Sequence, residues 1–163
     1  MTARITAGAF LSCGDKMLMI KRGEHKEPGP GMWAGVGGHL ELCDIANPRA
    51  INTKNACLRE VEEEAGIAAE KIRNLTLKYI AVRKDGNEIR IHHHYFGEVE
   101  HEFALPYCDE GELHWVEKSI IPGLPMSPTV REALLHRLKN PNDESFYLVA
   151  MAPDGVSATI SKI

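Results

Sequence analysis

The chain has 163 residues, of which 44% are hydrophobic and 26% charged, and its formal net charge is −4. This length and balance predict one soluble, globular domain over residues 1–163, without the basic field that would attract nucleic acid or an anionic membrane. With no leader segment, no apolar run long enough for a membrane span and four cysteines without a CxxC pair, we expect a cytoplasmic protein with reduced thiols.

The first predicted elements are two β-strands joined by a tight turn. Residues 5–13 and 16–21 are rich in apolar side chains, and Gly14-Asp15 between them is typical of a hairpin. The stretch 22–32 is polar and contains several Gly and Pro residues, so it predicts a loop.

A helix is predicted over residues 53–65, some way after a Gly37-Gly38 pair that we expect to form a turn. Asn52 suits the N-cap, and Gly66 suits the left-handed position that ends a helix. The buried stripe of this helix is expected at Leu58, Val61 and Ala65.

Downstream, strands and a second helix alternate with turn signals. The predicted helix covers residues 128–138, with Ser127 as its N-cap and proline at its first position. The predicted strands cover residues 75–84, 88–99, 112–116, 145–150 and 156–160. Pro153-Asp154-Gly155 separates the last two, which predicts a C-terminal hairpin over residues 145–161.

The first helix ends in a dense acidic run. Glu60, Glu63 and Glu64 fall at i, i+3 and i+4, which places three carboxylates on one face, where like charges repel. Such an oxygen-rich set suits a hard dication such as Mg²⁺, which also accepts water and phosphate oxygens. The alternative is a solvated acidic face, as most acidic runs are.

The segment around this run resembles the Nudix box, the signature of the Nudix (MutT-like) hydrolases. The family pattern is a glycine, five residues, a glutamate, seven residues and REUxEExGU, where U is aliphatic. Here the box would cover residues 38–67, and its second half matches at every fixed position from Arg59 to Ile67. Asp44 stands in place of the first glutamate, and the longer spacing that follows it is explained by a seven-residue insertion at 45–51.

The resemblance implies an α/β fold: an α/β/α sandwich with a mixed β-sheet between helices, to which this chain adds its C-terminal hairpin. A two-stranded hairpin is marginal alone, so it must pack on something. We expect it either to cover the sheet of its own chain or to pair with a second subunit, and we slightly favour the resulting homodimer.

The resemblance also implies a ligand set for Mg²⁺, for which Mn²⁺ can substitute. The expected metal ligands are Glu60, Glu63, Glu64 and the main-chain carbonyl of Gly37, with Glu110 as a further ligand from a later loop. A solvated acidic loop is the alternative for Glu110. The expected catalytic residues are Glu60, which we favour as both ligand and base, Glu63, and Arg59, which would pair with Glu63 or Glu41 and fix their rotamers.

Four residues are expected to contact substrate. Arg22 ends a predicted strand, where related enzymes carry a basic residue against phosphates, and Gly38 lies in the glycine pair. Trp33 would stack on a base or serve in packing. Met126 belongs to the segment 124–127, which is expected to line the base pocket. We interpret His92, His93 and His94 as structural or substrate-facing, since only alternate residues of a strand share a face.

The function implied is a Mg²⁺-dependent pyrophosphohydrolase of nucleoside diphosphate-linked compounds. The expected substrate is a small nucleoside triphosphate, including oxidised or non-standard ones, cleaved to the monophosphate and pyrophosphate, with no nucleic acid or membrane partner. An ADP-sugar or dinucleoside polyphosphate hydrolase is the alternative, although the proline or tyrosine that marks those subfamilies is absent from residues 82–85. A non-catalytic nucleotide sensor and a diphosphate isomerase using Cys43 or Cys57 are further alternatives.

Overall fold

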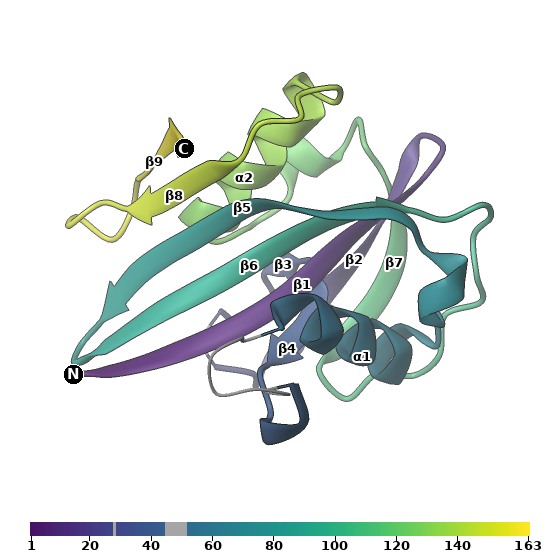
Figure 1. Ribbon diagram of the computed structural model, residues 1–163, viewed down its shortest axis with the longest axis horizontal. Helices are drawn as coiled ribbons and strands as arrows, with labels where there is room; N and C mark the ends of the chain where they lie inside the picture. Colours follow the sequence, from purple (N-terminus) through teal and green to yellow (C-terminus); the bar gives the residue numbers. More distant parts are fainter. Residues whose placement is uncertain (28, 45–51) are drawn as a thin grey trace.

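The computed structural model describes residues 1–27, 29–44 and 52–163, so the insertion predicted at 45–51 lies outside the described residues. Figure 1 shows a twisted sheet with a helix on either side of it. The strands are β1 (Thr2–Cys13), β2 (Lys16–Arg22), β3 (Trp33–Ala34), β4 (Val36–His39), β5 (Arg73–Asp85), β6 (Glu88–Glu98), β7 (Gly111–Glu117), β8 (Tyr147–Met151) and β9 (Ala158–Lys162). The helices are α1 (Thr53–Ala65) and α2 (Pro128–Lys139), and short 3-10 turns cover Leu42–Asp44, Ala69–Lys71 and Ile121–Gly123.

The sheet is mixed, as the sequence predicts. Its main path runs β3-β2-β1-β6-β5-β8-β9, while β4 pairs with β1 and β7 with β2. The pairs β1–β6 and β5–β8 are parallel, and the other pairs are antiparallel. Long β1 therefore contacts three strands: β6 along one side, and β4 and then β2 at successive stretches of the other side.

Two apolar clusters lie on opposite faces of the sheet because side chains alternate along each strand. On β1, Ala9 and Leu11 join the cluster that contains Val61 of α1, whereas Phe10 between them joins the cluster that contains Leu134 of α2. All five are fully buried. The two helices therefore cover opposite faces, which confirms the α/β/α sandwich.

The predicted bounds of α1 are confirmed, and both of its ends show the predicted caps. The Asn52 side chain accepts a hydrogen bond from the Asn55 amide, and Gly66 adopts φ 67° with its amide donating to the Glu62 carbonyl. The prediction for its buried stripe is partly wrong, because Leu58 is only half-buried at the border of the packed face. The fully buried residues of α1 are Ala56, Cys57, Val61 and Ala65.

One local prediction is wrong. Gly37 and Gly38 do not form a turn but lie in β4, opposite Gly8 and Ala7 of β1. A pattern of glycines suggests a turn, but here the missing side chains permit close strand packing. The prediction of Ser127 as the N-cap of α2, with proline at the first position, is confirmed, although the Ser127 side chain makes no capping hydrogen bond.

The C-terminal hairpin extends the sheet of its own chain. β8 pairs in parallel with β5, β9 pairs with β8, and α2 packs against both strands. Figure 1 shows this yellow hairpin beside α2 at the edge of the sheet. Of the two expectations for its packing, the structure thus shows contact within one chain. No helix in the described part of the chain is long and apolar enough to cross a membrane.

Candidate active site

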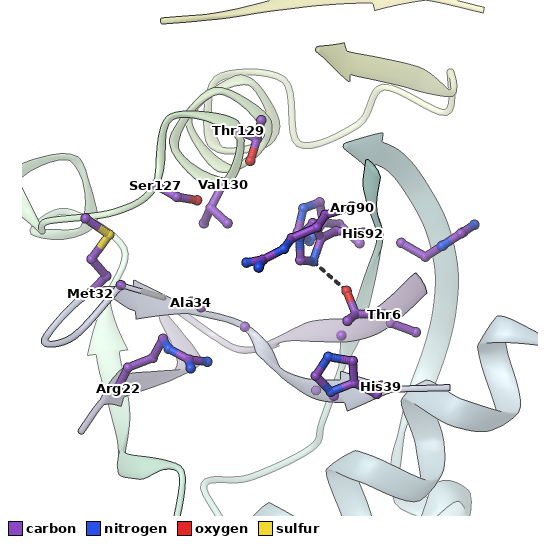
Figure 2. A pocket seen from close by; sticks show the side chains of 18 of the residues that line it. Thr6, Arg22, Met32, Ala34, His39, Arg90, His92, Ser127, Thr129 and Val130 are labelled. Atoms are coloured by element: carbon purple, nitrogen blue, oxygen red, sulfur yellow. Dashed lines mark hydrogen bonds between the residues drawn. The ribbon is translucent and has the colours of Figure 1, made fainter. Parts of the chain in front are cut away.

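A cavity of about 790 Å³ opens on the α2 face of the sheet. Figure 2 shows its floor of strands, with the start of α2 above it. The cavity has two chemically different ends. Glutamates gather at one end, among them Glu60, Glu64 and Glu110, and the arginines Arg4, Arg83 and Arg90 line the other.

The glycine pair of β4 brings the carboxylate end together. A side chain at Gly37 would meet the Ala7 carbonyl oxygen at 2.2 Å, so only glycine lets β4 lie this close to β1. A side chain at Gly38 would lie 2.5 Å from the Glu60 carboxylate, in space that this carboxylate now occupies. The sequence therefore needs both glycines for packing, and the second one leaves room for an acidic group.

Of these carboxylates, Glu64 has the pKa that is shifted furthest from its ordinary value. Burial and the nearby negative charges of Glu60 and Glu110 raise its pKa to about 7, against a hydrogen bond from the Gly37 main chain and the charge of Arg22 that favour ionisation. Its Oε2 is buried with no hydrogen-bond partner among the described residues. The pKa of Glu60 is also raised, chiefly by burial. A buried acceptor without a donor marks a place where a ligand can bind.

Arg59 links the end of β4 and the 3-10 turn Leu42–Asp44 to the acidic run of α1. Its guanidinium lies 3.0 Å from Asp44 Oδ2, 3.1 Å from Glu60 Oε1 and 3.1 Å from Glu63 Oε2, and it donates to the His39 carbonyl at 3.0 Å. The expected contacts with Glu63 and Glu41 are present, the latter at 3.7 Å.

The closest partner of Arg59, Asp44, is one that the sequence prediction missed. Asp44 is only 4% exposed, and burial favours its neutral form, but hydrogen bonds from Arg59 and the Glu41 amide outweigh burial and hold its pKa below the ordinary value. The sequence does contain a signal for this role, because Asp44 stands at a position of the box where the family pattern has a carboxylate. The inserted residues after it had obscured that role.

The structure separates Glu63 from the other two predicted ligands of α1. Its side chain is 58% exposed and turned toward Arg59, outside the cavity wall. Glu110, the expected ligand from a later loop, lies at the cavity, where its carboxylate is 2.9 Å from Lys26 Nζ. Glu60 and Glu64 are therefore the α1 carboxylates that face the cavity in this arrangement.

The donor set fits a hard dication that is completed by water and phosphate oxygens. Carboxylates that repel one another and an unpaired buried oxygen on Glu64 are relieved by a bound cation. In residues 1–27, 29–44 and 52–163, no three His, Cys, Asp or Glu side chains are gathered into a ready-made cage. The described residues thus suit a metal that keeps several of its own ligands.

Comparison with known proteins decides the family. A family model described as the NUDIX domain matches residues 2–138. The chain belongs to the Nudix family. It is therefore a hydrolase of phosphoanhydride bonds that acts on nucleoside diphosphate derivatives, a class that generally uses divalent metal ions.

Solved structures agree with this fold. A mutator MutT protein from Bacillus halodurans superposes with a TM-score of 0.71 at 22% identity, over 97% of each chain. A MutT NUDIX hydrolase from Burkholderia pseudomallei superposes with a TM-score of 0.62 at 26% identity, over 83% of this chain and 98% of the other. No curated protein matches the chain.

Three of the four predicted substrate-contact residues of this Nudix domain line the cavity: Arg22, Gly38 and Trp33. The Trp33 ring also packs against His114, with ring centroids 5.2 Å apart. Met126 is different, because it is buried in the α2 core cluster and does not line the cavity wall. Its chain neighbours Ser127, Thr129 and Val130 form that wall, as Figure 2 shows.

Strand alternation correctly predicts that His92 and His94 share a face. Their rings stack with centroids 6.2 Å apart, and His92 hydrogen-bonds Thr6 of β1 (Figure 2). Burial, His94 and Arg83 are the first causes that lower the pKa of His92, to about 3, so its ring is neutral. These histidines line the Nudix cavity as uncharged groups.

Proposed function

We propose that this Nudix hydrolase is a Mg²⁺-dependent pyrophosphohydrolase, with Mn²⁺ as a substitute, that cleaves a nucleoside triphosphate to the monophosphate and pyrophosphate. Oxidised and non-standard nucleotides are included in the proposed substrate range. The observation that carries the proposal is the unpaired, buried oxygen of Glu64 at the end of a nucleotide-sized cavity. We expect the reaction to take place in the cytoplasm.

The carboxylate end would hold the metal. We assign Glu60, Glu64, Glu110 and the Gly37 carbonyl as its ligands, and Glu63 would join them if Arg59 released its carboxylate. Such a metal neutralises phosphate charge and lowers the pKa of bound water. Glu60 and Glu63 are the proposed catalytic carboxylates, with Glu60 favoured as the base.

Arg59 would act by position rather than by touching the substrate. Its guanidinium holds Glu60 and Glu63 at 3.1 Å each, so it fixes the rotamers of both proposed catalytic carboxylates. On the substrate side, Arg22 would contact phosphates, while Trp33 and Gly38 border the bound nucleotide. Met126 would support this wall from behind, since it is buried next to Ser127.

The residues of the same cavity also bear on the alternative functions. An ADP-sugar or dinucleoside polyphosphate would use the same carboxylates, so these hydrolases stay the second candidate. A diphosphate isomerase would need a reactive thiol, but Cys57 is fully buried in the α1 core and burial raises its pKa to about 12. Cys43 is exposed and does not line the cavity. A non-catalytic sensor is disfavoured by the intact carboxylate set.

A panel assay tests the proposal. Nucleoside triphosphates, an ADP-sugar and a dinucleoside polyphosphate are incubated with the protein and Mg²⁺, Mn²⁺ or EDTA, and pyrophosphate, phosphate and monophosphates are measured. We expect pyrophosphate from at least one triphosphate, only when a divalent ion is present. Turnover of the ADP-sugar or dinucleotide alone would favour the second candidate, and nucleotide binding without turnover would favour the sensor.

A further inference from the structure

Three arginines form a row across the sheet at the end of the cavity opposite the glutamates. Arg4 of β1 is in register with Arg90 of β6, and Arg90 is in register with Arg83 of β5. All three line the cavity, so they share one face. Like charges on directly opposite residues destabilise a sheet, which makes this row costly unless something compensates it.

Carboxylates at the β5–β6 turn compensate only part of this charge. Arg90 lies 2.9 Å from Asp85 and 2.6 Å from Glu88, and Arg4 lies 3.6 Å from Glu88. Within the described residues, no carboxylate forms an ion pair with Arg83, and its buried Nε has no hydrogen-bond partner. Three cations therefore share two anions, and the uncompensated one faces the cavity.

The positive charges of the arginine row also lower the pKa values of two neighbouring histidines. Burial lowers the pKa of His39, and the charges of Arg4 and Arg90 lower it further. The same arginine row, through Arg83 and Arg90, adds to the causes that keep His92 neutral. Figure 2 shows Arg90 and His92 projecting into the cavity from β6, with His39 across from them.

The distance between the arginine row and the carboxylate end is about the length of a nucleoside. Gly8 of β1 is in register with Gly37, and Arg4 is four residues further along β1, roughly 13 Å away at about 3.3 Å per residue. We propose that the arginine row is a second anion-binding subsite, which takes a phosphate or carboxylate carried by the substrate at the end away from its diphosphate. This proposal rests on the proposed function, because it places the diphosphate at the glutamates. It concerns those diphosphate-linked substrates that carry a second anionic group, which an unmodified nucleoside triphosphate lacks.

Matched ligand pairs test the subsite by binding rather than by turnover. NADH and NADPH differ by one phosphate, and UDP-glucose and UDP-glucuronate differ by one carboxylate. Affinities are measured by calorimetry with Mg²⁺ in a Glu64→Gln background. We expect the more anionic member of at least one pair to bind about tenfold more tightly, as one charge-assisted hydrogen-bond pair provides. The pair that responds identifies phosphate or carboxylate as the ligand.

Substitutions on β5 supply the matched control. Arg83→Gln should abolish the preference, Arg83→Lys should keep part of it, and Lys84→Gln should keep all of it, because Lys84 is exposed and points to the opposite face. Equal affinities within both pairs, or an unchanged preference in Arg83→Gln, would overturn the subsite. Failure of the proposed function would show separately, as no turnover by the wild-type protein despite an intact binding preference.

Discussion

Glu63 and Glu64 are adjacent on α1, yet their carboxylates have different surroundings. Glu63 is exposed and neutralised by Arg59, whereas Glu64 is half-buried, faces two other carboxylates and keeps one unpaired oxygen. An uncompensated buried carboxylate is costly in the protein alone, and a bound cation would offset that cost. The two residues should therefore respond differently to removal of charge.

Glu64→Gln should lower kcat by about 100-fold or more, because it removes a charge from the proposed metal site while keeping the side-chain volume. Steady-state kinetics at saturating Mg²⁺ would measure this. Glu62→Gln is the matched control, since Glu62 is exposed on the same helix and should keep wild-type turnover. Glu63→Gln distinguishes its two roles: a loss like that of Glu64→Gln supports ligation, and a loss below about tenfold supports positioning through Arg59.

Stability without metal should depend on pH through Glu64. Its pKa is near 4.5 when unfolded and about 7 when folded, so the folded state binds the proton more tightly. Protonated Glu64 therefore contributes its full share of the stability below the unfolded pKa, and this share is lost as the pH rises toward 7. In EDTA, the free energy of unfolding should fall between pH 5 and 8 by on the order of 1–2 kcal/mol from this group.

Urea titrations of wild-type and Glu64→Gln proteins at pH 5, 6, 7 and 8 would check this. The variant should lose this part of the slope and be the more stable protein at pH 8. Parallel pH profiles for the two proteins would show that the Glu64 carboxyl titrates at its ordinary pKa in the folded state.

Residue identities in the box could be predicted from sequence because a fixed spacing places them on one helix. The directions of their side chains could not, since Glu63 turns to Arg59, whereas Glu60 lies against Gly38 and Glu64 accepts a hydrogen bond from the Gly37 main chain. The arginine row was missed for a related reason. Arg4 and Arg83 are far apart in the chain and become neighbours only through the register of β1, β6 and β5.

At the scale of elements, both ends of α1 could be predicted from the sequence. The contact that joins this helix to the preceding turn could not. Local signals at Asn52 and Gly66 mark the helix, so the chain itself defines where it starts and stops. The contact between Arg59 and Asp44 joins α1 to the 3-10 turn Leu42–Asp44 on the other side of the insertion. This ion pair therefore holds the turn against the helix.

Asp44→Asn should therefore destabilise the protein by about 2–4 kcal/mol, because it leaves the Arg59 guanidinium without its closest anion. Glu41→Gln is the control, since Glu41 is 62% exposed at 3.7 Å from the same arginine and should cost less than about 1 kcal/mol. Chemical denaturation at pH 7 measures both. Equal, small effects would mean that the pair does not hold the turn Leu42–Asp44 against α1.

On the scale of the whole molecule, the hairpin β8–β9 lies beyond residues 2–138, which match the family. It continues the sheet from β5 and leaves β9 at the end of the strand order. A homodimer that pairs through this edge stays our prediction, because an exposed edge strand is a template for another strand. Light scattering across a range of concentrations would give the mass, and a monomer at all of them would contradict it.

The hairpin should also belong to the cooperative core. Val149 of β8 is fully buried among residues of β5 and α2, while Val156 in the β8–β9 turn is 78% exposed. Val149→Ala should lower the free energy of unfolding by about 1–3 kcal/mol, and Val156→Ala by less than about 0.5 kcal/mol. Both variants lose the same two methyl groups, so the comparison isolates burial. A single urea transition that shifts only in Val149→Ala would show that the segment folds with the Nudix domain. A separate early transition, or no shift, would show that the hairpin is only attached to it.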